Sequence, residues 1–107
     1  MPESIAYSTD APTAEVVQAM PGLVLLDFGT DWCGHCRGAR ASVDAWAAAR
    51  PGITHLRVED GRGRRLGRAY TVKLWPTLVL LRDGGEIARV VRPRQAHELA
   101  PLDAALG

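Results

Sequence analysis

Runs of apolar residues along the chain predict its strands. Residues 23–28 are apolar at almost every position, which is typical of a strand buried on both faces of a sheet. Residues 53–59 alternate between apolar and polar side chains, which is the period of a strand. Three further strands are expected, over residues 5–7, 77–82 and 86–91. The last two are joined by the turn sequence Asp83-Gly84-Gly85 and should form an antiparallel hairpin.

Helices are expected between and after these strands, over residues 11–20, 33–49, 61–70 and 95–106. The first two end at Pro-Gly pairs, which stop helices. In the second helix, Val43, Trp46 and Ala47 share one face, as expected for a helix that packs on a core. The third contains three glycines, which lower its helix propensity. The last contains Pro101, which a helix tolerates only in its first turn.

The alternation of strands and helices predicts an α/β fold with parallel crossovers and one antiparallel hairpin. At 107 residues, the chain is expected to form one domain over residues 1–107. The sequence contains no internal repeat, low-complexity tract or linker.

Composition and charge narrow the class of function. The net charge is only +1, so there is no general attraction to nucleic acid or to a membrane surface. No run reaches the roughly 18–20 apolar residues of a membrane span. Residues 1–19 lack the apolar core of a signal peptide, so we expect a cytoplasmic protein. Four arginines between residues 62 and 68 lack interleaved aromatic residues, and we interpret them as a solvated face.

Cys33 and Cys36 are separated by two residues, at the point where a strand ends and a helix begins. The unpaired N–H groups and the positive dipole at a helix start stabilise a thiolate at Cys33. We therefore predict that Cys33 attacks a target disulfide. Cys36 lies one turn into the helix, should be more buried, and is expected to resolve the mixed disulfide. Two cysteines are too few for a disulfide scaffold.

A metal centre is the other kind of site that paired cysteines can build. These two supply only two ligands, whereas a closed zinc site needs four, and the sequence holds no second pair. Covalent haem attachment is excluded because Arg37, and not histidine, follows Cys36. We therefore expect no metal, while a site shared between two copies of the chain stays open.

Asp27 and His35 are the other candidate catalytic residues. Asp27 lies within the most apolar strand, where burial should raise its pKa, unless it sits at a strand end and reaches water. His35 lies between the two cysteines, where a cation or hydrogen-bond donor favours the thiolate of Cys33 and so the reduced form. A stabilised reduced form makes a stronger oxidant. The alternative is that His35 merely fills the loop.

Two sequence motifs carry a resemblance to a known family. Trp32-Cys33-Gly34-His35-Cys36, which follows the apolar strand, and the later Trp75-Pro76-Thr77 resemble the thioredoxin family from about residue 23 to residue 99. The Cys-Gly-His-Cys centre is more similar to protein disulfide isomerase domains than to typical thioredoxins, which carry proline in place of His35. The resemblance implies a thioredoxin fold, with a central mixed β-sheet flanked by helices on both faces.

The resemblance also implies roles for individual residues. Asp27 would accept the proton of Cys36 through water during the second exchange step. The substrate-binding surface would comprise Trp32, Gly34, Trp75 and Pro76. Pro76 would be preceded by a cis peptide bond that leaves the backbone of Trp75 free to pair with an extended substrate segment.

This sequence also departs from the family pattern at several positions around the predicted centre, namely Gly29, Ala41, His55, Trp75 and Arg92-Pro93. Gly29 stands where thioredoxins usually carry a second tryptophan. Arg92 stands where the family has a glycine that leaves the docking groove open. His55 occupies a position often filled by a lysine near the buried aspartate, although a lone histidine in a strand is more often structural. These departures keep the redox centre and alter its surroundings.

The function that we predict is thiol–disulfide exchange between the Cys33–Cys36 pair and protein disulfides or dithiols. No bound cofactor is needed, but a reductase or another thiol electron donor must supply electrons. We expect a monomer that binds neither nucleic acid nor membranes. A cytoplasmic location favours a reductase, whereas His35 favours a more oxidising couple, so the direction stays open. The alternative is a thioredoxin-like binding module or partner-specific chaperone in which redox activity is incidental.

Overall fold

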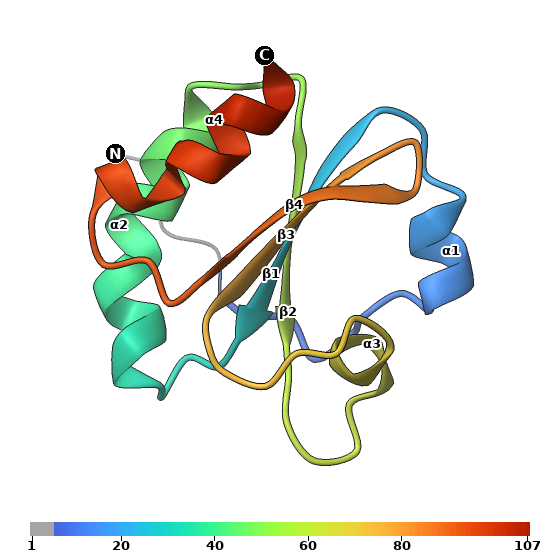
Figure 1. Cartoon of the computed structure of the whole chain (residues 1–107). Coiled ribbons are helices and arrows are strands. Elements are labelled where there is room, and N and C mark those ends of the chain that lie inside the picture. Colours follow the sequence, from blue (N-terminus) through green and yellow to red (C-terminus); the bar gives the residue numbers. More distant parts are fainter. Residues whose placement is uncertain (1–5) are drawn as a thin grey trace.

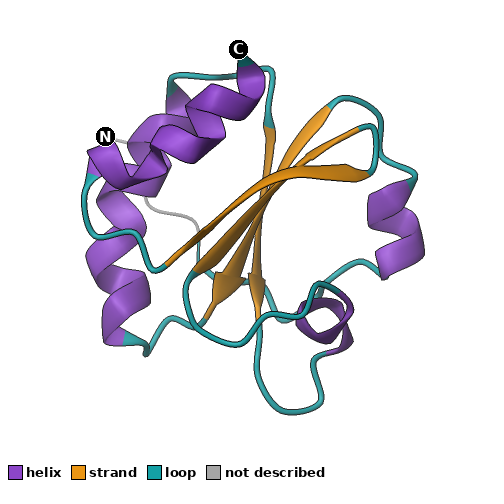
Figure 2. Ribbon diagram, in the orientation of Figure 1, coloured by secondary structure: helices purple, strands orange, loops and turns teal. Residues whose placement is uncertain are grey.

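The computed structural model describes residues 6–107, whose core is one mixed β-sheet with the strand order β2-β1-β3-β4. The strands are β1 (Leu23–Gly29), β2 (Thr54–Glu59), β3 (Thr77–Arg82) and β4 (Gly85–Val91). The helical segments are α1 (Ala14–Gln18), α2 (Gly34–Ala48), α3 (Arg65–Ala69), the 3₁₀ turn η1 (Ala96–Leu99) and α4 (Ala100–Leu106). The sheet crosses the middle of the molecule, with helices on either side (Figures 1 and 2).

The sheet combines parallel and antiparallel pairing, as predicted. β1 runs parallel to β2, which follows it through the α2 crossover, and antiparallel to β3. β3 and β4 form the expected antiparallel hairpin. The register of the parallel pair sets Asp27 of β1 opposite Arg57 of β2. Because β1 has a neighbour on each edge and helices on each face, its apolar run is buried.

Helices cover both faces of the sheet, which confirms the predicted layered architecture (Figure 1). On one face, Leu25 of β1 packs in a cluster with side chains from α2, η1 and α4. On the other face, Val24, Leu26 and Phe28 pack with Val17 of α1 and with a leucine of α3. The division follows from the two-residue period of a strand, which sends neighbouring side chains to opposite faces. Asp27 has the parity of Leu25 and therefore points to the α2 face.

Several helices are shorter than the sequence pattern predicts, for local reasons. α1 starts at residue 14 because the Thr13 hydroxyl accepts the N–H of Val16 and caps the helix there. The predicted helix over residues 61–70 is reduced to α3, because Gly61 and Gly63 adopt positive φ values of 135° and 80°. The last helix begins as a 3₁₀ turn, and Pro101 lies at the start of α4, where it is tolerated.

The strand predicted over residues 5–7 is not formed in the described part of the chain, which begins after Ile5. Ser8 instead makes a single parallel bridge with Val58 of β2. Its N–H donates to the carbonyl of Arg57 at 3.0 Å, and its carbonyl accepts the N–H of Glu59 at 2.8 Å. These two bonds fasten the N-terminal segment to the edge of the sheet and bring Tyr7 beneath α2.

Within residues 6–107, the helices are all too short or too polar to cross a membrane.

Candidate active site

The two cysteines lie at the N-terminus of α2, where the sequence predicts them. Cys33 is the N-cap residue, with extended backbone dihedral angles of −75° and 123°, and its carbonyl accepts the N–H of Arg37 at 3.0 Å. Cys36 lies in the first turn. Both are free thiols, with 8% of Cys33 and 1% of Cys36 exposed. As expected, Cys36 is the more buried of the pair.

The environments of the two thiols shift their pKa values in opposite directions. Burial raises the pKa of Cys33, but hydrogen bonds from the backbone and thiol of Cys36 and from the backbone of His35 outweigh it, so the pKa falls below its ordinary value. Burial raises the pKa of Cys36 to about 11, against the hydrogen bond from the backbone of Thr30. Cys33 therefore forms its thiolate at a lower pH than Cys36, which is the order that attack by Cys33 followed by resolution by Cys36 requires.

Aromatic side chains flank the thiols on the open side. Trp32 is 70% exposed and meets Trp75 edge to face, with ring centroids 5.7 Å apart. The indole N–H of Trp75 donates to Asp60 at 2.8 Å, which fixes the ring. The peptide bond between Trp75 and Pro76 is cis, as the family resemblance implies. Trp75, which Pro76 follows, thus contacts both Trp32 and the buried cluster that holds the two cysteines.

Arg92 lies against this surface and occupies one of its hydrogen-bonding groups. Its Nε donates to the carbonyl of Trp75 at 2.8 Å, and its backbone N–H donates to the carbonyl of Pro76 at 2.8 Å. Arg92 has a φ of 52°, in the region that glycine adopts most readily. The Trp75 carbonyl, which the resemblance leaves free for a substrate strand, is therefore already paired.

A pocket of about 180 Å³ adjoins the cysteine loop and is lined by Gly34, His35, Gly38, Arg92, Pro93 and Arg94. His35 is exposed and contributes its side chain to this pocket, whereas its backbone makes the hydrogen bond to Cys33. The positive charge of Arg92 also lowers the pKa of Cys33. The surroundings of the reactive sulfur are thus basic on the pocket side.

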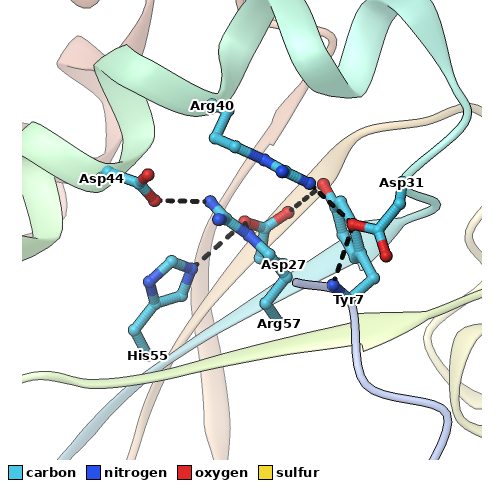
Figure 3. Close-up of polar contacts among 7 residues, drawn as sticks. All are labelled: Tyr7, Asp27, Asp31, Arg40, Asp44, His55 and Arg57. Carbon is cyan, nitrogen blue, oxygen red and sulfur yellow. Dashed lines mark hydrogen bonds and ion pairs between the residues drawn. The ribbon is translucent and has the colours of Figure 1, made fainter. Parts of the chain in front are cut away.

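Asp27 is buried and lies at the centre of a network of polar side chains (Figure 3). One carboxylate oxygen, Oδ2, accepts from Nε of Arg57 at 2.7 Å and lies 3.1 Å from Nε2 of His55. The other, Oδ1, accepts from the hydroxyl of Tyr7 at 2.9 Å. Arg57 reaches on to the carboxylate of Asp44 on α2 at 2.9 Å. Each oxygen of the buried carboxylate therefore has a partner.

Two sequence-based expectations for Asp27 are wrong. Asp27 is 1% exposed, so it does not reach water at a strand end. Its pKa is lowered and not raised: desolvation acts to raise it, but the hydrogen bond with His55 and the charge and hydrogen bond of Arg57 outweigh that effect. His55 does contact Asp27, as its position suggests, but the permanent positive charge comes from Arg57.

Sequence reasoning missed both Arg57 and Tyr7. For Arg57 a signal existed, because an arginine in the middle of a strand next to the central one must pair its charge if it is buried. Tyr7 offered no such signal, since nothing local shows that the segment before α1 reaches the cysteines.

Gly29 at the end of β1 explains how a tyrosine ring fits here. A Cβ atom at this position would lie 2.5 Å from Sγ of Cys36 and 2.8 Å from the hydroxyl oxygen of Tyr7. No side chain fits at such distances without displacing one of them. The glycine that replaces the usual tryptophan of the family thus makes room for Tyr7.

Metal-ligating side chains do not gather in residues 6–107, where no group of three or more His, Cys, Asp or Glu could hold an ion.

Comparisons with known proteins agree with this geometry. The sequence model of the family described as Thioredoxin matches residues 4–102. The thioredoxin of Chlamydia trachomatis is 38% identical over 81 residues, covering 76% of this chain and 79% of that protein. The thioredoxin of Chlamydia pneumoniae is 40% identical over the same shares. Reduced thioredoxin 2 from Pseudomonas aeruginosa PAO1 superimposes with a TM-score of 0.86 and 47% identity, covering 98% of each chain.

The match extends over the whole fold and includes the paired cysteines, so a binding module with incidental cysteines is not favoured. The sequence, the sheet topology and the relatives agree that this chain belongs to the thioredoxin family of thiol–disulfide oxidoreductases.

Proposed function

We propose that this protein reduces protein disulfides in the cytoplasm as a monomer, with electrons from a thiol reductase. The observation that carries the proposal is the contrast between Cys33, whose pKa is lowered, and the more deeply buried Cys36, whose pKa is raised. The family relatives support the general activity, since thioredoxins act on protein disulfides together with a reductase. We further propose that neither nucleic acid nor a membrane takes part.

The proposed reaction has two exchange steps. The Cys33 thiolate attacks one sulfur of the substrate disulfide, and the other sulfur leaves as a thiolate. Cys36 then attacks Sγ of Cys33, which closes the protein disulfide and releases the second substrate thiolate. As the family resemblance implies, we take the Asp27 carboxylate, which is ionised at neutral pH, as the acceptor of the Cys36 proton.

The substrate would dock on the surface formed by Trp32, Gly34, Trp75 and Pro76. The exposed Trp32 ring and the edge-to-face Trp75 offer an apolar platform beside the reactive sulfur. An extended substrate segment would pair with the Trp75 backbone, in competition with Arg92 for its carbonyl. This competition favours substrates that make additional contacts with the platform or pocket.

His35 is proposed to tune the redox potential. It follows Cys33 by two positions and lines the adjoining pocket. Thioredoxin has a potential of about −270 mV and protein disulfide isomerase of about −180 mV, whereas cytosolic glutathione is poised near about −220 to −260 mV. A reductant in that compartment must be more reducing than about −220 mV.

The deciding experiment is the Cys33–Cys36 potential, measured by equilibration in glutathione and dithiothreitol buffers with tryptophan fluorescence as the signal. We expect a value below about −220 mV, and a shift to a still lower value in His35→Pro. Reduction of insulin, measured in parallel, should be abolished in Cys33→Ser. A potential near about −180 mV would contradict a reductant role and indicate an oxidant or isomerase.

A further inference from the structure

Tyr7 is held in place from several directions, although it lies outside every helix and strand. Its backbone N–H donates to Asp31 at 3.1 Å (Figure 3), and the residue is only 6% exposed. The guanidinium groups of Arg40 and Arg57 lie 5.7 and 5.4 Å from the ring centroid. Such contacts between cations and an aromatic face are attractive. The hydroxyl group is therefore presented at a fixed position.

That position lies between the buried acid and the resolving thiol. The hydroxyl donates to Oδ1 of Asp27 at 2.9 Å. A Cβ built on Gly29 would meet both Sγ of Cys36 and the Tyr7 hydroxyl, so these two atoms converge over the Gly29 backbone. The Tyr7 hydroxyl also lies within hydrogen-bonding reach of the Cys36 sulfur, and when it turns its proton toward that sulfur it favours the thiolate and acts to lower the pKa of Cys36. Tyr7, Cys33 and Cys36 form one buried cluster.

The partners of the Asp27 carboxylate indicate which of its oxygens would receive the proton of Cys36. Oδ2 is taken by Arg57 and His55, both on β2, so the oxygen that remains is the one bonded to Tyr7. A proton that leaves Cys36 reaches Asp27 along these contacts by passing through the hydroxyl. Burial and the nearby carboxylate raise the pKa of Tyr7 far above its ordinary value, so it does not store charge as a phenolate. A group that stays neutral can transmit a proton only by giving one as it receives one.

We propose that the Tyr7 hydroxyl is a catalytic proton relay between Cys36 and Asp27 in the resolving step. The Cys36 S–H bond breaks as its proton moves to the Tyr7 oxygen, and the proton that Tyr7 held moves to Oδ1 of Asp27. The Cys36 sulfur forms its bond with Sγ of Cys33, whose bond to the substrate breaks, and the substrate leaves as a thiolate. Asp27 returns its proton to solvent afterwards. The inference rests on the proposed two-step function.

The test is a single turnover of the reduced protein with oxidised glutathione, quenched in acid and analysed by protein mass. Wild-type protein should form a Cys33–glutathione mixed disulfide that decays to the internal disulfide. Tyr7→Phe should form it at the wild-type rate and resolve it about tenfold more slowly, near the lower limit for acid–base catalysis because water can partly substitute. An unchanged decay rate in Tyr7→Phe would overturn the relay.

Tyr70→Phe is the matched control. It removes a hydroxyl that is also buried, lies on the opposite face of the sheet and has no hydrogen-bond partner among residues 6–107. Its decay rate should equal that of the wild type. Slowing of equal size in both phenylalanine variants would indicate a general effect of losing a buried hydroxyl and would overturn the proposal.

Two further measurements separate a relay from a purely positioning tyrosine. The double variant Tyr7→Phe/Asp27→Asn should resolve no more slowly than the slower single variant, since both changes break one proton path, whereas multiplied effects would overturn the relay. In wild-type protein, the decay rate should depend quadratically on the deuterium fraction of the solvent, because two protons move together. A linear dependence would overturn it even if Tyr7→Phe did not fold.

The single-turnover experiment distinguishes failure of the proposed exchange function from failure of the Tyr7 relay. A wild-type protein that forms no mixed disulfide, or never resolves it, would refute the exchange function itself. Normal resolution in wild type and in Tyr7→Phe alike would refute only the relay.

Discussion

Nε of Arg57 donates a hydrogen bond of 2.7 Å to Oδ2 of Asp27, and each side chain is only 1% exposed. The two residues come from adjacent parallel strands and stand opposite each other in the register. A buried carboxylate without this partner would take up a proton to avoid desolvation of its charge. With the guanidinium beside it, Asp27 stays ionised at neutral pH, as its proposed role of proton acceptor requires.

Arg57→Met should raise the pKa of Asp27 above its ordinary value, because burial then acts with only His55 and Tyr7 to oppose it. We expect a loss of about 3–5 kcal/mol in the free energy of unfolding at pH 7, as when one partner of a buried pair is removed. Urea titrations measure this loss. Arg50→Met, which breaks a partly exposed pair with Asp103, should cost about 1 kcal/mol or less.

The stability of the wild type and of Arg57→Met should change with pH in opposite directions. In wild type the pKa of Asp27 is depressed, so its stabilising contribution is present above about pH 4 and is lost as pH falls through the lower folded-state value. In Arg57→Met the folded pKa is raised, so protonation relieves the destabilisation and the variant should gain stability between pH 7 and pH 5. A variant that loses stability over that interval would contradict the assignment.

The two thiols should titrate far apart. Alkylation of the reduced protein with iodoacetamide should modify Cys33 first, with a half-maximal rate at a pH below the ordinary cysteine pKa. Cys36 should stay unmodified until the pH approaches about 11. Peptide mapping after alkylation at each pH identifies the modified residue. Preferential alkylation of Cys36 at neutral pH would reverse the proposed roles.

Arg92→Gly should release the carbonyl of Trp75 for substrate. One competing hydrogen bond contributes about 1 kcal/mol, so we expect a roughly fivefold lower KM for a protein disulfide such as that of insulin. The same change should raise the pKa of Cys33, because a positive charge near the thiolate is lost. Arg94→Gly removes a charge from the same pocket and is the control. An unchanged KM in Arg92→Gly would show that substrates do not use this carbonyl.

Gly29→Ala should destabilise the protein by about 1–3 kcal/mol, because the added methyl group would overlap Cys36 and Tyr7. Gly38→Ala provides the control on α2, where an added Cβ meets no atom within 4 Å. That substitution should stabilise the protein by about 0.4–1 kcal/mol, since alanine is the better helix former and restricts the unfolded chain. Thermal unfolding of both variants tests the pair of predictions, and equal stabilities would refute the crowding at Gly29.

Much of the fold follows from local pattern. The apolar run over residues 23–28 is β1 with one residue added, and the strand over residues 77–82 is reproduced as β3. The Asp-Gly turn forms the expected hairpin, with positive φ at Asp83 and Gly84. Helix boundaries were less predictable, because a cap such as Thr13 or a glycine with positive φ ends a helix wherever the backbone requires it.

The sequence by itself determined the reactive pair: a strand followed by a helix sets Cys33 at an N-terminus and Cys36 one turn inside, and both effects act within a few residues. Only the tertiary structure decided what surrounds them. Asp27, Arg57 and Tyr7 are separated by twenty or more residues and meet through strand register and a segment fastened to β2. The physical reason is that a buried charge is stabilised by whatever partner the fold brings within hydrogen-bonding distance, and no local pattern encodes that distance.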